Sequence, residues 1–576
     1  MEKWMMCNKA GDFEGIMNEF GLSMIGARLL VNRGITGHGS IKEFLDPDIS
    51  MLHSPFLLAD LERAADCLVK GISEGKSVRV VGDYDVDGIM AVYILTDALG
   101  LCGCRVDWYI PHRIKDGYGI NTEMIASAVN DGIDIIVTCD NGIAAFDAAD
   151  DARKNGITMI ITDHHEVQDR LPDCDIIVDP KRPDDTYPCK DICGAVVAAK
   201  LAQALFEKKG LNIPQDHYLE FMAMATVCDV VKLIGENRVI VKKGIKKLIN
   251  TPNPGLSALI DEKGIDRANL SEYHIGFVLG PCFNATGRID DAGVALKMLT
   301  GKDRSEAVEL ARQCVQLNEE RKEMTAREEA KAVELVDSLA ELPKVIVVEL
   351  EGCHESILGI IAGRLKEHYS RPAIAATKSA DGYKASGRST ENYNIFEELK
   401  KCSDLLVRFG GHPMAAGLTI RENCFDEFRD RLNGNCELSE ADMYKKVLLD
   451  LEVSFNIFNL KNVEEISLFA PFGQGNPSPL FGERNLKVKG ISYIGRDNSF
   501  LKFVFENAYG HTIVATLFSN AAETVDALKE KYGEDQVAKA FGGRQNDIVL
   551  TAAYVPKINT YHDIKELQMN IKYLKL

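Results

Sequence analysis

The sequence predicts an α/β protein in which two α/β units precede a strand-rich C-terminal unit. One observation is the segment SVRVVGDYDVDG, in which an apolar strand runs directly into three alternating aspartates. Another is the alternation of apolar strands and helices from Ser77 to Pro180 and again after Lys344, which is typical of largely parallel sheets covered by helices. The last is a series of short strands from Lys445 onward. The 576 residues have the length of about three to four domains, which accommodates these units.

The composition is that of an ordinary globular protein, with 46% hydrophobic and 27% charged residues. No apolar run approaches the ~20 residues that span a membrane, and the N-terminal segment lacks the pattern of a signal peptide. Fifteen cysteines are scattered without a CxxC pair, which indicates reduced thiols and a cytoplasmic protein. The net charge of −19 excludes a surface coated with DNA-binding basic residues, but not a single basic channel.

The first 310 residues predict a helical segment followed by an α/β domain. Residues 1–55 carry short helical patterns, and residues 56–310 are expected to form the first α/β domain. Its helices should begin near Gly88, Thr122, Ala144 and Gly194. Its strands are predicted at Ser77–Val81, Arg105–Ile110, Asp134–Thr138, Thr158–Thr162 and Asp175–Val178.

The remaining chain predicts a connecting helix, a second α/β domain and a barrel. The charged segment Leu317–Leu339 indicates a long solvated helix within residues 311–340. Residues 341–440 should contain the strand KVIVVEL, a helix near Ile357–Tyr369, a strand at Pro372–Ala376, and the segments ASGRST and FGGHPMAAGLT, which we expect to be loop-rich. Over residues 445–576, five or six short strands predict a small OB-like β-barrel.

Three carboxylates follow the first predicted strand. Asp83, Asp85 and Asp87 lie at its carboxyl end, the edge where open α/β sheets bind their ligands. Because carboxylates repel one another, such a group is stabilised by a cation. A calcium-binding EF-hand loop is excluded, because its twelfth position must be glutamate and here is Ile94, and because a strand precedes the loop.

More acidic and imidazole side chains follow apolar segments downstream. We expect them to converge with the first three aspartates at one edge of the sheet. A ligand set rich in carboxylates favours Mn²⁺ or Mg²⁺ over Zn²⁺. There are more carboxylates than one cation needs, which predicts two ions bridged by one aspartate, an arrangement suited to phosphoryl displacement. The side chains are Asp140 after DIIVTC, the triplet Asp163, His164 and His165 after MIIT, and Asp229 after ATVC.

Four motifs resemble motifs I to IV of the DHH phosphoesterases, namely VGDYDVDG, TCDNG, TDHH with VDPK, and CDVV. Later segments narrow the resemblance to the RecJ-type single-stranded-DNA exonucleases. PCFNATGR is similar to that family's NAxGR segment, ASGRS and GGHPMAAG to its DHHA1 domain, and PFGQGNPSPLF and YVPKINTY to the ends of its OB domain. The resemblance covers nearly the whole chain. It implies a DHH catalytic domain, a long connecting helix, a DHHA1 domain and a C-terminal OB domain, in the ranges given above.

The resemblance also implies roles for individual residues. Asp140 would bridge the two ions, and Asp83 would be either a direct ligand or a neighbour of the ligands. The other expected metal ligands are Asp85, Asp87, His164 and Asp229. The expected catalytic residues are His165 at the scissile phosphate, Asp163 orienting a histidine, and Arg288 as a phosphate-binding guanidinium. The expected substrate-binding residues are Asn284, His412, and the group Arg113, Ser386 and Arg388, which would bind a terminal 5′-phosphate.

The function implied is a metal-dependent exonuclease that degrades single-stranded DNA from the 5′ end to mononucleotides, in DNA repair and recombination. One alternative is a DHH phosphodiesterase acting on short oligonucleotides or cyclic dinucleotides, which the C-terminal strands disfavour. Another is a degenerate, non-catalytic DNA-binding scaffold, which the intact aspartates disfavour. Single-stranded DNA is the expected partner, and a single-stranded-DNA-binding protein and a repair helicase are candidate protein partners of a monomeric enzyme.

Overall fold

The computed structural model describes residues 2–519, 521–561 and 564–576, and the side chains of residues 560, 561 and 564 lie outside the described part. The chain forms two compact units. One unit comprises Asp48–Tyr444, and the other combines Met1–Pro47 with Lys445–Leu576. Within the described residues, no helix has both the length and the apolar character needed to cross a membrane. All fifteen cysteines are free.

The larger unit begins with a five-stranded parallel sheet in the order β3-β2-β4-β5-β6. The strands match the sequence prediction to within one residue at each end. In this order β3 lies on one side of β2, and β4, β5 and β6 follow on the other side. The chain order therefore switches between β2 and β4, and such a switch opens a crevice at the carboxyl ends of the two strands. The strands are β2 (Ser77–Val81), β3 (Arg105–Tyr109), β4 (Ile135–Cys139), β5 (Thr158–Thr162) and β6 (Ile176–Val178).

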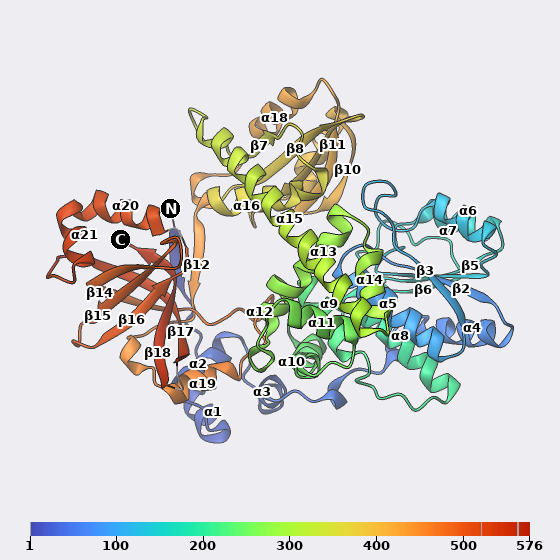
Figure 1. Ribbon diagram of the computed structural model, residues 1–576, viewed down its shortest axis with the longest axis horizontal. Coiled ribbons are helices and arrows are strands. Elements are labelled where there is room, and N and C mark those ends of the chain that lie inside the picture. Colours follow the sequence, from blue (N-terminus) through green and yellow to red (C-terminus); the bar gives the residue numbers. More distant parts are fainter. Residues whose placement is uncertain (1, 520, 562–563) are drawn as a thin grey trace. The chain divides into compact units, whose positions relative to one another are not determined.

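Helices cover both faces of this sheet (Figure 1). Because side chains alternate along a strand, Val78 and Val80 pack toward one face while Val81 packs toward the other. The first face is covered by α4 (Leu61–Ser73), α5 (Val86–Leu101) and α8 (Gly194–Lys209). The second is covered by α6 (Thr122–Asn130) and α7 (Phe146–Lys154).

A helical region follows the sheet and ends in one long helix. That helix, α15 (Arg304–Asp337), starts at an Asp303 side chain that accepts hydrogen bonds from the backbone of Ser305 and Glu306. The preceding elements are α9 (Leu219–Cys228), α10 (Gly235–Ile249), α11 (Pro254–Glu262), α12 (Glu272–His274), the π-helical turn η4 (Ile275–Leu279), α13 (Gly280–Ile289) and α14 (Gly293–Thr300).

The second sheet of this unit has the order β10-β11-β9-β8-β7, with only the β7–β8 pair parallel. The expectation that ASGRST and FGGHPMAAGLT are loops was wrong, since they form strands β9, β10 and β11. Their glycines hide the strand pattern but are tolerated because each strand is paired along its length. The elements are β7 (Ile346–Glu349), α16 (Leu358–Tyr369), β8 (Ala373–Ser379), β9 (Gly382–Arg388), α17 (Ile395–Lys400), β10 (Leu406–His412), β11 (Ala415–Ile420) and α18 (Phe425–Gly434).

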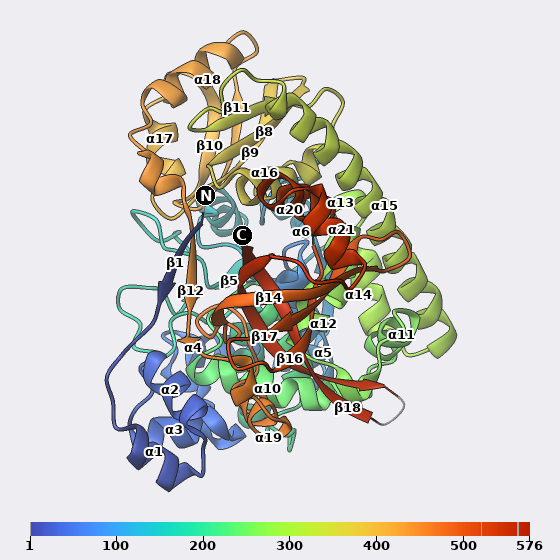
Figure 2. The same ribbon diagram turned by 90° about the vertical axis from the view of Figure 1, so that its left-hand side faces the viewer.

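The smaller unit contains a closed five-stranded barrel (Figure 2). Its strands pair in the ring β14–β15–β16–β18–β17 and back to β14, which confirms the OB-like barrel expected from the sequence. The strands are β14 (Phe481–Ile494), β15 (Phe500–Glu506), β16 (Thr512–Leu517), β17 (Val549–Tyr561) and β18 (Ile564–Lys575). Around them lie β13 (Leu451–Glu452), α19 (Leu460–Ser467), α20 (Ala521–Tyr532) and α21 (Glu534–Phe541).

The N-terminal residues pack with this barrel. The strand β1 (Glu2–Met6), which the sequence did not reveal, pairs in parallel with β12 (Lys445–Leu449). The backbone and hydroxyl groups of Ser23 donate to the Glu465 carboxylate at 2.9 and 2.8 Å. Arg33 forms an ion pair with Asp450 at 2.9 Å. The predicted helical content is present as α1 (Phe13–Phe20), α2 (Met24–Asn32) and α3 (His38–Leu45).

Candidate active site

The site lies where β2, β4 and β5 end, at the point where the strand order reverses. The loop after β2 is held by its own side chains. Asp85 caps α5, with one carboxylate oxygen accepting from the backbone of Asp87 at 3.0 Å and of Gly88 at 3.1 Å. A Cβ atom at Gly88 would lie 2.4 Å from the carbonyl oxygen of Asp83, so only glycine allows the loop to fold this tightly.

Asp87 is fixed by a second helix. Its two carboxylate oxygens accept from the backbone N–H groups of Gly194 (2.6 Å) and Ala195 (2.7 Å), at the N-terminus of α8. The positive end of that helix stabilises a negative side chain. Gly194 is also pressed against Asp140, because a Cβ atom there would lie 2.6 Å from the Cβ of Asp140. The start of α8 therefore positions two of the expected metal ligands.

Asp140 follows β4 in a left-handed backbone conformation, with φ of 61°. Asn141, which is fully buried, donates to the carbonyl oxygens of Val81 (3.1 Å) and Cys139 (3.0 Å) and so ties the ends of β2 and β4 together. Few residues other than glycine adopt this conformation, but aspartate and asparagine tolerate it. The conformation aims the Asp140 carboxylate at the crevice between the strands.

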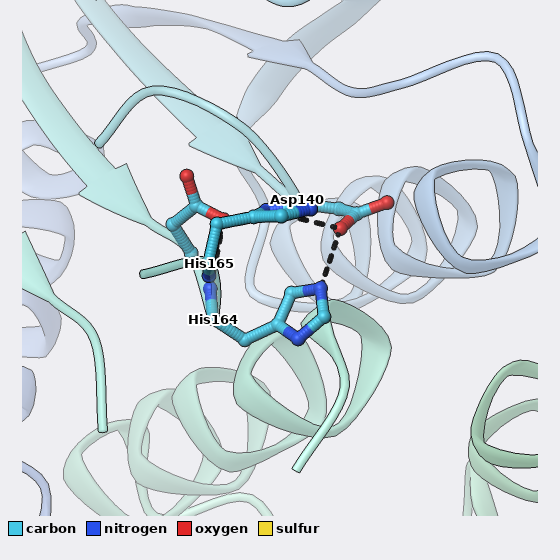
Figure 3. Close-up of side chains that lie close together, drawn as sticks. Asp140, His164 and His165 are labelled. Atoms are coloured by element: carbon cyan, nitrogen blue, oxygen red, sulfur yellow. Dashed lines mark hydrogen bonds and ion pairs between the residues drawn. The ribbon is translucent and has the colours of Figure 1, made fainter. Parts of the chain in front are cut away.

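The two histidines after β5 lie in different environments. His164 is buried, and its Nε2 lies 3.0 Å from Asp140 and 3.5 Å from Asp87, while its Nδ1 lies 3.8 Å from Asp229. Figure 3 shows its ring turned toward the Asp140 carboxylate. His165 is more exposed, and its Nδ1 lies 2.7 Å from the buried Asp163 carboxylate.

These environments move the two imidazole pKa values in opposite directions. Burial lowers the pKa of His164 to about 4, so its ring is neutral, as a metal ligand must be. Burial also disfavours the charged form of His165, but the hydrogen bond and negative charge of Asp163 outweigh it and raise the pKa of His165 to about 9. His165 is thus a cation at neutral pH, with Asp163 fixing its orientation.

The last expected ligand, Asp229, comes from a helix and not from the sheet. We expected all the clusters to follow strands of one sheet, but Asp229 is the residue at which α9 ends. The next residue, Val230, is 64% exposed and has φ of 58°, a strained conformation for a β-branched side chain. The strain marks a sharp turn directly after Asp229.

The carboxylates form two adjacent groups that suit cations. Atoms of Asp83, Asp85 and Asp140 lie within 4.8 Å of one another, and so do atoms of Asp87, His164 and Asp229. Burial, followed by repulsion from the neighbouring carboxylates, raises the pKa of Asp83 and Asp140 well above the usual range and that of Asp229 to about 8. One buried oxygen of Asp83 has no hydrogen-bond partner. Divalent cations would relieve the repulsion and use this oxygen, so the residues fit metal ions.

A cavity of about 350 Å³ opens beside these groups, between α16 and the strands β9–β11. Arg113 connects the two regions, since its guanidinium lies 4.8 Å from the ring of Tyr84 in the loop after β2. Among the described residues that line the cavity, only Glu355 carries a carboxylate. The basic side chains that line it are Arg113, Arg288, Lys384, Arg388 and Arg408, and the hydroxyl side chains are Ser356, Ser386 and Thr419.

Four residues that were expected to bind substrate or phosphate line the cavity, and two others that were expected to bind substrate do not. Arg113, Arg288, Ser386 and Arg388 line it, with Arg288 also donating to the Ser356 carbonyl at 2.6 Å. Asn284 instead accepts a hydrogen bond from the backbone of Val86 at 3.2 Å, beneath the loop after β2. His412 is exposed at the tip of the β10–β11 hairpin.

Comparison with known proteins places these features in a family. Residues 77–226 match the DHH family N-terminal domain, 342–437 the DHHA1 domain and 449–573 the RecJ OB domain. The chain is 36% identical over 485 residues to the single-stranded-DNA-specific exonuclease RecJ of Bacillus subtilis, covering 84% of this chain and 61% of that relative. It is 34% identical to the protein of the same name from Dickeya dadantii, covering 75% of this chain and 81% of the relative. The chain belongs to the RecJ family.

Solved RecJ structures share the fold. A Thermus thermophilus RecJ crystal structure in complex with Mn²⁺ matches all of this chain and 79% of that chain, with a TM-score of 0.83 and 26% identity. A crystal structure of exonuclease RecJ bound to manganese matches 69% of this chain and all of that chain, with a TM-score of 0.60 and 31% identity. The RecJ-type arrangement of DHH sheet, DHHA1 sheet and OB barrel is therefore present.

Three residues at the site escaped the sequence analysis. Lys384 alternates with Ser386 and Arg388 on one face of β9, a spacing that could have identified it had β9 been recognised as a strand. Arg408 joins them from β10. The Tyr118 hydroxyl donates to the Asp140 carbonyl at 3.2 Å and lies 3.3 Å from both ring nitrogens of His165, a contact that no local pattern signals.

Proposed function

We propose that this RecJ-family protein is a metal-dependent exonuclease that degrades single-stranded DNA from its 5′ end to 5′-mononucleotides. The observation that carries the proposal is the juxtaposition of an acidic centre fit for cations with a cavity lined by five basic side chains. A metal centre would supply the hydrolysis, and the basic cavity beside it would accept the end of a strand. A small-substrate phosphodiesterase would have no use for the C-terminal barrel, and a scaffold would have none for repelling carboxylates.

Asp85, Asp87, Asp140, His164 and Asp229 would hold two Mn²⁺ or Mg²⁺ ions, and RecJ structures with Mn²⁺ and with Mg²⁺ are known from Thermus thermophilus. Such ions lower the pKa of water and offset charge on phosphate oxygens when bound. Asp140 would be the natural bridging ligand, since it belongs to the group with Asp83 and Asp85 and its carboxylate lies 3.0 Å from His164 of the other group.

The chain's own residues orient the scissile phosphate. His165, protonated at neutral pH, donates to a phosphate oxygen on which negative charge develops. Asp163 keeps the His165 ring in place and charged through the 2.7 Å contact. Arg288 adds a guanidinium, whose pKa is lowered to about 10 by burial and by Arg113, so it is still charged at pH 7 and gains from an anion between the two.

The cavity defines polarity by binding a terminal 5′-phosphate. Ser386 and Arg388 lie 3.2 Å apart on β9, and burial, then the nearby Arg113, lowers the pKa of Arg388. The N-terminus of the twelve-residue helix α16 contributes Leu358 and Gly359 to the lining, where backbone N–H groups favour an anion. Asn284 and His412 would act on the substrate from outside this cavity.

The barrel would hold part of the single strand, and the enzyme would act in the cytoplasm. Exposed aromatic rings suit base stacking, and Tyr493, 41% exposed, stacks on Phe541. Phe481 is fully buried in the barrel core, so its ring is not available to a base. The side chain of Tyr561 lies outside the described residues.

Digestion of DNA strands tests the proposal. Strands labelled at either end, single or double, are incubated with Mn²⁺, Mg²⁺ or EDTA. We expect mononucleotides from the 5′ end of single strands with either cation and no product in EDTA. Nicking of circular single strands, shortening from the 3′ end, or full activity in EDTA would refute it.

A further inference from the structure

Two aromatic side chains stand on the surface near the candidate active site without a place in it. Tyr273 and Phe277 are 60% and 72% exposed. Their rings stack with centroids 5.3 Å apart and planes inclined by 28°. Between and after them, Ile275 and Leu279 are fully buried and face the core. The segment therefore packs normally on one side and presents an aromatic pair to solvent on the other, which is unfavourable in water.

The segment is fixed against the helix that ends at Asp229. The Cys228 thiol donates to the carbonyl oxygen of Ile275 at 3.8 Å, and a Cβ atom at Gly280 would lie 2.4 Å from the same sulfur. Phe277 belongs to the π-helical turn η4. Such turns are rare in proteins, and those that occur often lie at functional sites. The aromatic pair is thus held in a set position relative to the metal ligands.

The π-helical turn continues directly into α13. The aromatic pair, the metal-binding loop and the cavity can therefore be ordered along one helix. Asn284 contacts the base of the metal-binding loop through the 3.2 Å hydrogen bond from Val86, and Arg288 lines the cavity at the other end of the helix. At about 1.5 Å per residue, Phe277 lies roughly 10 Å before Asn284 along the helix. The order along this helix is aromatic pair, metal centre, cavity.

We propose that Tyr273 and Phe277 form a stacking platform for the bases on the 3′ side of the scissile phosphate. The inference rests on the proposed function, which puts the 5′ end in the cavity and so directs the rest of the strand toward this pair. Roughly 10 Å accommodates about three bases at a spacing of about 3.4 Å. Stacking accepts every base because each has a π face, which suits an exonuclease that must cut any sequence.

The test measures binding in EDTA and turnover in Mn²⁺ with the full chain. The probe is a ten-nucleotide 5′-phosphorylated oligo-dT, compared with the same strand carrying abasic sites at nucleotides 2 to 4. The double variant Tyr273→Ala/Phe277→Ala should raise Kd and KM for the intact strand at least about 5- to 150-fold, the range given by ~1–3 kcal/mol for the loss of a single stacked base. It should leave kcat, and Kd for the abasic strand, nearly unchanged.

Three variants complete the test. Exchanging the pair, Tyr273→Phe/Phe277→Tyr, keeps both rings and should bind as the wild type does. Tyr273→Leu/Phe277→Leu keeps apolar surface without rings and should lose affinity. Phe56→Ala removes another exposed ring, which lies over Lys208 away from the site, and should have no effect.

Several results would overturn the platform. They are unchanged affinity of the alanine double variant, an equal loss on intact and abasic strands, or full affinity of the leucine pair, which would point to an apolar protein contact. A wild-type protein that neither binds nor cuts single strands would instead refute the proposed function itself.

Discussion

Asp140 offers a test in which losing a metal ligand should make the metal-free protein more stable. Burial and repulsion from neighbouring carboxylates raise the pKa of Asp140 well above its usual range and that of Asp229 to about 8, whereas an unfolded aspartate titrates near 3.8. Between these pH values the folded protein binds more protons than the unfolded chain. Stability of the metal-free protein therefore falls as pH rises from about 4 to about 8.

Replacing Asp140 by asparagine removes one of the repelling charges without changing the backbone, because asparagine tolerates a φ of 61°. Because the pKa of Asp140 is raised well above its usual range, the charged carboxylate destabilises the folded metal-free protein at alkaline pH, and Asp140→Asn should raise its Tm there. In a unit of roughly 400 residues, each kcal/mol of relieved repulsion raises Tm by about 1 °C.

Mn²⁺ should stabilise the wild type more than it stabilises the Asp140→Asn variant. A cation at a hundredfold excess over its Kd stabilises the wild type by about 2.7 kcal/mol, which raises Tm by about 3 °C. Because binding displaces protons, this shift should be larger at pH 8 than at pH 6. Asp140→Asn should lose most of it.

Thermal unfolding in EDTA and in Mn²⁺, at pH 6 and pH 8, measures both effects. Asp185→Asn is a matched control, since Asp185 is equally buried but accepts hydrogen bonds from the backbone of Ala59 and Tyr187, both at 2.7 Å. The control should be less stable by about 1–3 kcal/mol and keep the full Mn²⁺ shift. The reasoning is refuted if Asp140→Asn also destabilises the metal-free protein at pH 8 and retains the Mn²⁺ shift.

Three further outcomes are expected. Asp163→Asn should lower the pKa of His165 from about 9, so that kcat/KM falls more at pH 8 than at pH 6, and an unchanged pH profile would contradict the role of the pair. Arg388→Ala should raise KM for 5′-phosphorylated strands and reduce their advantage over 5′-hydroxyl strands; an equal effect on both would argue against a terminal-phosphate site. Lys200→Met should cost about 3–5 kcal/mol in urea unfolding because it leaves the buried Glu236, 2.6 Å away, unpaired, and adding Glu236→Leu should recover most of the loss.

The sequence predicted the first sheet well because its signals are local. Each buried strand is a short apolar run bounded by polar residues, so Ser77–Val81 and Thr158–Thr162 were placed to the residue. The convergence of Asp83 and Asp140 follows from parallel pairing, since strands that run the same way end at the same edge. Domain order came from the resemblance of motifs, which local physics alone does not supply.

What escaped prediction depends on contacts between distant segments. The strand β1 exists because β12, more than 400 residues later, pairs with it. Strands β9 to β11 are rich in glycine, and their identity comes from their neighbours in the sheet. Asp229 lies at the end of helix α9, 3.8 Å from His164, and the apolar pattern of α9 does not predict that proximity.

The joining of Met1–Pro47 to Lys445–Leu576 has a consequence for synthesis. The first 47 residues leave the ribosome early, yet β12, which pairs with β1, and the partners of Ser23 and Arg33 are made only after residue 444. At about 5–20 residues per second, the N-terminal helices wait roughly 20–80 s with their barrel-facing surface uncovered. The larger unit, whose residues are contiguous, can fold during that interval. A premature stop anywhere before the barrel would therefore leave the beginning of the protein, and not only its end, without a folded partner.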